Sequence, residues 1–131
     1  MLTAGRDTVE VAGGRHLTLP VKGNVKIYEG GLVMLQTGLA IPGTSAAGLV
    51  TAGRAETFVD NTGGADGAQS ITVKRGVFLF ENDQASPVTN ADLLKDCYVL
   101  DDETVTSDST DASVAGKVLG FENGEVIVEI L

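Results

Sequence analysis

Glycine interrupts this 131-residue chain so often that long helices have little room to form. Its seventeen glycines follow no fixed period, which excludes a collagen-like repeat and favours short strands joined by tight turns. The clearest example is VAGKVLGFENGEVIVEIL near the C-terminal end. Asn123–Gly124 is a preferred pair for a two-residue hairpin turn, and it places Phe121 opposite Val126. We therefore predict a C-terminal β-hairpin.

A second hairpin is predicted around Gly30–Gly31. Val25 and Ile27 alternate with polar neighbours before this pair, and the apolar run 32–35 follows it. Two adjacent glycines supply the positive φ angles that a two-residue turn needs.

The segment SITVKRGVFLF changes its pattern at Gly76. Before this glycine the strand is half apolar, and after it residues 77–80 are apolar on both faces, which indicates a buried strand. A β-bulge at Gly76 would place four side chains on one side of a single strand. These side chains are Ile71, Val73, Phe78 and Phe80.

These patterns predict an all-β protein, a compact β-barrel or sandwich of about eight short strands with minimal helix. Helix is expected only at about residues 89–95, where Thr89 or Asn90 offers an N-cap. Residues 1–23 show no sustained period and are expected to form an extended N-terminal arm. Residues 24–131 are expected to form a single β-barrel-like domain.

The formal net charge is −9, and most of it lies in the second half of the chain. Residues 1–66 hold five basic and six acidic groups, whereas residues 67–131 hold four basic and twelve acidic groups. An acidic surface repels phosphate backbones, so we expect no nucleic-acid partner. No uncharged stretch approaches the roughly 20 residues needed to span a bilayer, so we expect no membrane partner and folding in a cytoplasm.

The loop DNTGGADG (60–67) suggests a metal or phosphate site at first sight. Read from Asp60, it fails the EF-hand pattern at four of five tested positions, and it lacks the Lys of a P-loop. Turn formation explains its composition better. The acidic run Asp101, Asp102, Glu103, Asp108 and Asp111 is likewise expected to be a solvated loop.

Residues suited to catalysis are scarce. The single cysteine, Cys97, lies far in sequence from the single histidine, His16, and we expect its thiol to be buried and inert. We therefore expect a protein that is not an enzyme and has no catalytic residues, no metal site and no cofactor.

The N-terminal arm is the candidate partner-binding segment. Its candidate contact residues are Arg6, Arg15, His16 and Lys22. A segment of this composition buries little surface and would become ordered by adding a strand to a partner protein or to a neighbouring subunit. The alternative is that it forms the first strand of the barrel.

Three segments carry a resemblance to a known family. They are the G-V-F sequence of Gly76–Phe78, the YVLDDETV sequence of residues 98–105 and the A-G-x-V sequence of residues 115–118. With their flanks they resemble the small head-decoration (capsid cement) proteins of tailed, Mu-like bacteriophages.

The resemblance implies a β-rich homotrimer that binds the major capsid protein on the outer surface of the capsid. It also implies that the protein is made in the host bacterial cytoplasm, is localised to the virion and has no catalytic residues. Two other hypotheses stay open from the sequence. One is a virion-displayed β-domain that binds carbohydrate or a host surface, and the other is a small acid–base or metal-dependent enzyme that uses the acidic loops.

Overall fold

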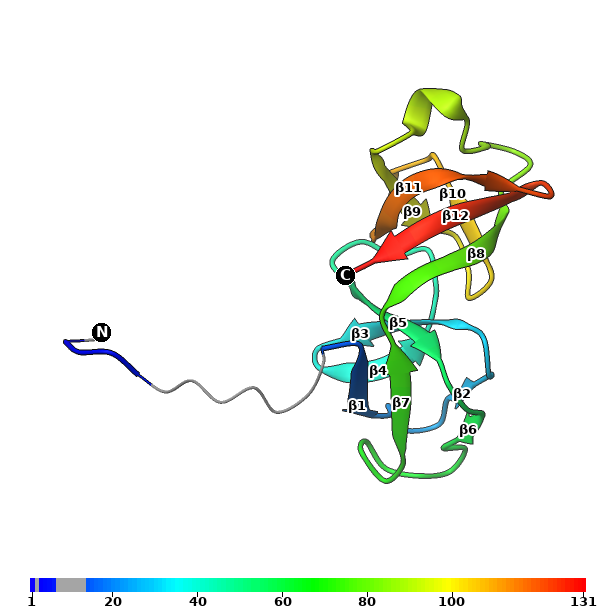
Figure 1. Ribbon diagram of the computed structural model, residues 1–131. Coiled ribbons are helices and arrows are strands. Elements are labelled where there is room, and N and C mark those ends of the chain that lie inside the picture. Colours follow the sequence, from blue (N-terminus) through cyan, green and yellow to red (C-terminus); the bar gives the residue numbers. More distant parts are fainter. Residues whose placement is uncertain (2, 7–13) are drawn as a thin grey trace.

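The computed structural model describes residue 1, residues 3–6 and residues 14–131. In this part of the chain it is all-β, which confirms the predicted fold class (Figure 1). Twelve strands and one short 3-10 helix, η1 (Asn90–Asp92), form two stacked bodies (Figure 1). The short helix lies inside the predicted range 89–95, as expected.

The first body, here called the N-terminal sheet, has the strand order β1-β7-β5-β3-β4, with every neighbouring pair antiparallel. A parallel bridge between Val21 and Ala40 brings its two edge strands together. A short two-stranded sheet, β2-β6, lies beside it. The strands are β1 (His16–Pro20), β2 (Lys26–Ile27), β3 (Leu32–Gln36), β4 (Leu39–Pro42), β5 (Val50–Ala55), β6 (Val59–Asp60) and β7 (Ser70–Lys74).

The second body is a closed barrel with the strand order β10-β8-β12-β11-β9, here called the C-terminal barrel. Only Arg75 separates β7 from its first strand, so the chain passes from one body to the other almost without a loop (Figure 1). The strands are β8 (Gly76–Asn82), β9 (Asp96–Val99), β10 (Thr104–Thr106), β11 (Val114–Glu122) and β12 (Glu125–Ile130).

Two hydrophobic cores result, and β3 contributes to both. Val33 is fully buried with the residues of the N-terminal sheet, among them Ile71 and Val73. Its neighbours Leu32 and Met34 are fully buried in the core of the C-terminal barrel. Successive side chains of a strand point to opposite faces, so β3 is buried on both faces between the two bodies.

The C-terminal hairpin forms as predicted. Asn123 and Gly124 have φ angles of 51° and 82° and connect the paired residues Glu122 and Glu125. Phe121 lies opposite Val126, again as predicted.

The hairpin predicted at Gly30–Gly31 is wrong, because β2 pairs with β6 and not with β3. Strand β3 instead turns back on β4 through Thr37–Gly38, whose φ angles of 49° and 82° fit the same turn chemistry. The backbone N–H of Gly30 donates to the carbonyl of Ala55 at 2.9 Å. This glycine pair therefore extends the pairing between β3 and β5 beyond the start of β3.

The bulge predicted at Gly76 is a change of sheet. Strands β7 and β8 belong to different bodies, so Ile71 and Phe80 lie in different cores. The prediction that residues 77–80 are buried on both faces is also wrong, since Val77 and Leu79 are 51% and 42% exposed. These two apolar side chains therefore lie at the surface of the C-terminal barrel.

The predicted boundary between an arm at 1–23 and a domain at 24–131 differs from the observed one. His16–Pro20 is strand β1, and all five of its residues pair with β7. This is the alternative in which the segment forms the first strand. Residues 7–13 lie outside the described part of the chain. The expected single barrel is also divided, because the strands separate into two bodies on either side of Arg75.

Replacing Phe80 by Ala should lower the free energy of unfolding by about 3–5 kcal/mol, because this ring is 4% exposed in the barrel core. Phe78 is half-buried and lies under the Arg54 guanidinium, so Phe78→Ala should cost only about 1–2 kcal/mol. Urea denaturation of both variants measures the difference. Equal losses would contradict the burial described for β8.

Candidate interaction surfaces

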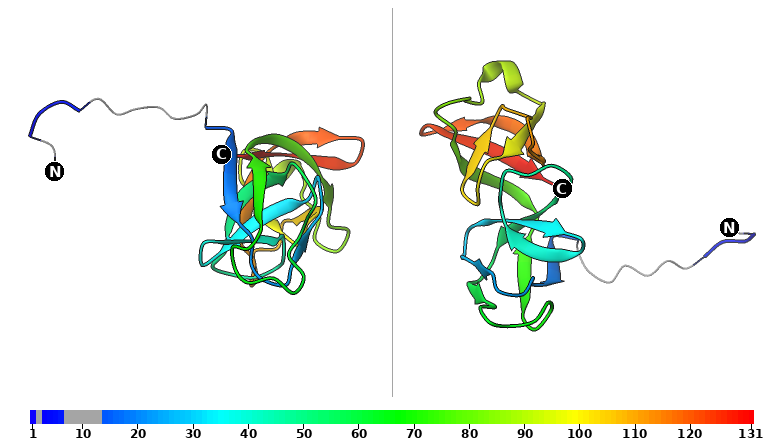
Figure 2. Two further views of the ribbon diagram at one scale, coloured as in Figure 1. Left: turned by 90° about the horizontal axis from the view of Figure 1, so that it is seen from below. Right: turned by 180° about the vertical axis from the view of Figure 1, so that it is seen from behind.

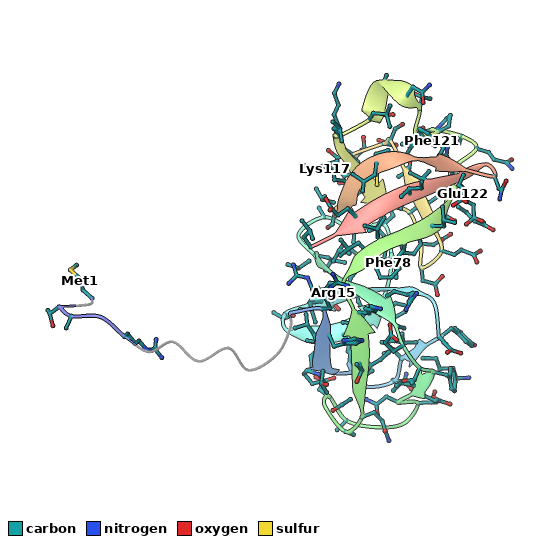
Figure 3. All side chains as sticks on the ribbon, in the orientation of Figure 1. Met1, Arg15, Phe78, Lys117, Phe121 and Glu122 are labelled. Carbon is teal, nitrogen blue, oxygen red and sulfur yellow. The ribbon has the colours of Figure 1, made fainter. Side chains whose placement is uncertain are left out.

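The four predicted partner-binding residues do not form one patch. Arg15 and His16 are adjacent and exposed at the start of β1. Lys22 lies beyond the other end of this strand, where its Nζ donates to Gln36 Oε1 at 2.8 Å. Arg6 is exposed in the N-terminal segment, and Met1 lies well away from Arg15 (Figure 3).

Arg15 borders a groove at the junction of the two bodies. One part, about 480 Å³ in volume, is lined by residues that include Arg15, Arg75, Val77 and Leu131. A smaller adjoining hollow of about 180 Å³ shares two of these residues, Arg75 and Leu131. It is otherwise apolar apart from one threonine, with Leu17, Leu35, Val50, Thr51 and Ala52 as its other lining residues. We call the combined feature the junction groove.

The junction groove exposes large apolar side chains. Val50, Val77 and Leu131 are 62%, 51% and 79% exposed. Single exposed apolar residues are ordinary on protein surfaces, whereas a cluster of them makes the groove a candidate interaction surface.

A second surface contains two exposed aromatic rings. The rings of Tyr28 and Phe58 pack against each other at a centroid distance of 5.3 Å with their planes inclined by 38°, although they are 58% and 52% exposed. Tyr28 also lines a hollow of about 450 Å³ together with Glu29, Asp102 and Glu103. We call these five residues the aromatic–acidic patch.

The charges near this patch are poorly balanced. The carboxylates of Glu81 and Asp101 raise the pKa of Glu103 above its usual range, because like charges disfavour a further negative charge. Nearby Glu56 is balanced instead, since its Oε1 accepts a hydrogen bond from Arg54 at 2.8 Å, which lowers its pKa. Within the described residues this is the only ion pair.

The loop 60–67 is filled by its own side chains. Asn61 is 3% exposed, and its Nδ2 donates to the carbonyl oxygens of Val21, Lys22 and Ala65 at 3.2, 3.1 and 3.0 Å. Asp66 Oδ1 accepts the backbone N–H of Gly23 at 2.8 Å. These hydrogen bonds fasten the loop to residues 21–23 and hold the turn.

The acidic run 101–111 is not one continuous loop, because β10 lies inside it and its Val105 is fully buried. Asp101 and Asp108 each accept a backbone N–H two residues further along the chain, at 2.9 Å. Among the residues with described placement, no group of three His, Cys, Asp or Glu side chains is suited to hold a metal ion.

Cys97 is fully buried, as predicted. Burial raises the pKa of its thiol to about 12, because the core of the barrel cannot solvate a thiolate. The thiol is therefore protonated at neutral pH and is held as part of the barrel core.

Comparison with known proteins gives no match, whether with family models, with curated proteins or with solved structures. In the chain segments that are described, no helix has the length and apolarity that crossing a bilayer requires.

Both interaction surfaces were missed in the sequence. The junction groove joins residues as far apart as Leu17 and Leu131, which no local pattern links. Tyr28 and Phe58 belong to separate turns, and only the sheet pairing of β2 with β6 brings them together. A detectable signal was the position of each aromatic ring beside a turn, where burial is difficult.

Calcium or EDTA should leave the melting temperature within about 1 °C of its value in plain buffer, because no ion is needed to hold loop 60–67. Differential scanning calorimetry measures this. A calcium-dependent rise of about ten degrees would show that the acidic groups gather an ion.

Replacing Glu103 by Gln should raise the melting temperature slightly at neutral pH. Repulsion raises the folded-state pKa of Glu103, so its ionisation opposes folding above the unfolded value of about 4.3. The gain should disappear as the pH falls below that value.

Asp108 provides a control, because its pKa is lowered whereas that of Glu103 is raised. The backbone N–H of Thr110 donates to Asp108 and lowers its pKa, so the charged carboxylate stabilises the fold above its unfolded pKa. Asp108→Ala should lower the melting temperature at neutral pH, and the difference should fade as the pH drops through the lowered folded pKa. Equal pH profiles for the two variants would contradict these assignments.

Proposed function

We propose that this protein is a structural virion protein that binds the outer surface of a phage capsid and stabilises the shell. The observation that carries the proposal is the form of its exposed apolar surface. The junction groove and the aromatic–acidic patch open to solvent and expose apolar side chains, which suits contact between protein chains, such as neighbouring copies on a shell, better than enclosure of a small ligand.

The segments that resemble capsid cement proteins support the proposal by their position. Gly76–Phe78 begins β8, residues 98–105 include the end of β9 and the start of β10, and residues 115–118 lie in β11. All three belong to the C-terminal barrel, which they help to build around one core. The resemblance as a whole covers roughly residues 20–131, so it extends over the N-terminal sheet as well.

The physical requirements of shell decoration also fit. A decorating protein is repeated many times by symmetry, so many modest contacts suffice to stabilise the shell. A net charge of −9 keeps such a protein soluble at high concentration. The partners in this proposal are the major capsid protein and further copies of the chain, as a homotrimer.

Binding to capsid shells is the direct test. The full chain should sediment with shells built from the major capsid protein of the same genome, with saturation at a fixed ratio and a higher melting temperature of the shell. The Leu94→Asp variant is a suitable control, because this side chain is 70% exposed away from both surfaces and has a positive φ of 63° that Asp accepts. Absence of binding by the folded wild type would overturn the proposal.

A test of whether the N-terminal segment docks on the shell requires a deletion shorter than the predicted arm of residues 1–23. Removing residues 1–19 would destroy most of β1 and its pairing with β7. Removing residues 1–13 leaves β1 intact, so the truncated protein should keep its melting temperature. We expect its affinity for shells to fall by roughly tenfold or more, because strand addition contributes through backbone hydrogen bonds. Unchanged affinity would assign docking to the body of the protein.

A further inference from the structure

We propose that copies of this chain bind one another head to tail, with the junction groove of one copy receiving the Tyr28–Phe58 pair of the next. Each copy carries both surfaces, so one kind of chain is sufficient to form the contact. The occupant of the groove in this proposal is a second copy of this chain.

The two surfaces lie at opposite ends of strand β5. Val50, at its start, lines the apolar hollow of the junction groove. Arg54 and Ala55, at its end, line a hollow together with Glu29 of the aromatic–acidic patch. Five residue steps along a strand span roughly 17 Å, so the two surfaces are well separated.

The overall arrangement agrees. The C-terminus and the start of β1 lie on one side of the molecule, and β2 with its connection to β3 lies on the other (Figure 1). The view from behind shows the same separation (Figure 2). Surfaces placed in this way can join copies in series without blocking each other.

The surfaces are complementary in charge, and both expose apolar side chains. The groove offers exposed aliphatic side chains and the cations Arg15 and Arg75. The patch offers two exposed rings with the carboxylates of Glu29, Asp102 and Glu103 near them. Aromatic side chains are typical anchors of protein interfaces, and opposite charges around them set the orientation.

The side chains that line the groove include more basic than acidic groups, although the net charge of the protein is −9. The lining includes two arginines, Arg15 and Arg75, and one acidic side chain, Glu129. The repulsion around Glu103 would be relieved by an arginine of a neighbouring copy. Contact between two copies would therefore place the arginines of one groove beside the carboxylates of the next patch, which lowers the repulsion between like charges.

A contact between two different surfaces is heterologous, so it leads to a closed ring or to a filament. This inference does not depend on capsid binding, because the contact involves only this chain. Its test uses the purified protein without shells, so its failure is distinguishable from failure of the proposed function.

The test uses one variant for each surface. Val50→Asp places a carboxylate in the groove, and Phe58→Asp removes one ring and adds charge to the patch. Both side chains are more than half exposed, so both variants should fold. Their melting temperatures check this, and Leu94→Asp is the matched control that adds the same charge outside both surfaces.

Light scattering after size-exclusion chromatography gives the mass of each species. Wild type and Leu94→Asp should form oligomers, whereas each of the other two variants alone should be monomeric, with self-association weakened by roughly tenfold or more. An equimolar mixture of Val50→Asp and Phe58→Asp should form a one-to-one dimer and nothing larger, because only one intact groove and one intact patch remain.

Four results would overturn the proposal. The first three are a monomeric wild type, oligomers that survive both substitutions, and a mixture of the two variants that stays monomeric. Fourth, if Phe58→Asp alone remained oligomeric while Val50→Asp did not, two grooves would be joined symmetrically and the head-to-tail contact would be wrong.

Discussion

The burial of β3 on both faces is the constraint on which the rest of this structure depends. Leu32 and Met34 complete the core of the C-terminal barrel, and Val33 between them completes the core of the N-terminal sheet. Neither body closes its core without this strand. A polar residue at any of these positions would open one core, so a continuous apolar run is required here.

Backbone hydrogen bonds hold the two bodies in register around this strand. The N–H of Leu32 donates to the carbonyl of Asp102 at 2.8 Å, so the turn before β10 is fixed to the start of β3. Gly43 lies so close to this turn that a Cβ atom would come within 2.9 Å of the carbonyl oxygen of Asp101. Ser113, which is 6% exposed, donates to the carbonyl of Ala46 at 2.6 Å and accepts the N–H of Leu49 at 3.0 Å. The Asp102 contact lies at the aromatic–acidic patch, and the Leu49 contact lies next to Val50 of the junction groove.

The parts of the fold that the sequence predicted are those set by local chemistry. The Asn123–Gly124 turn, the short helix near residue 90 and the burial of Cys97 depend on a few neighbouring residues. The pairing of β2 with β6, and the change of sheet at Arg75, depend on partners far along the chain. The run 32–35 fits a hairpin strand as well as a strand buried on both faces, because periodicity cannot distinguish them. The same limit hid the interaction surfaces, whose residues come together only after folding.

The proposed function depends on surfaces to which both bodies contribute side chains. Cryo-electron microscopy of shells carrying the bound protein tests this most directly. The account predicts density for both bodies on the outer face of the shell, in one relative orientation, with the Tyr28–Phe58 pair of each copy in the junction groove of its neighbour. Density inside the shell, or copies that meet through other surfaces, would contradict it.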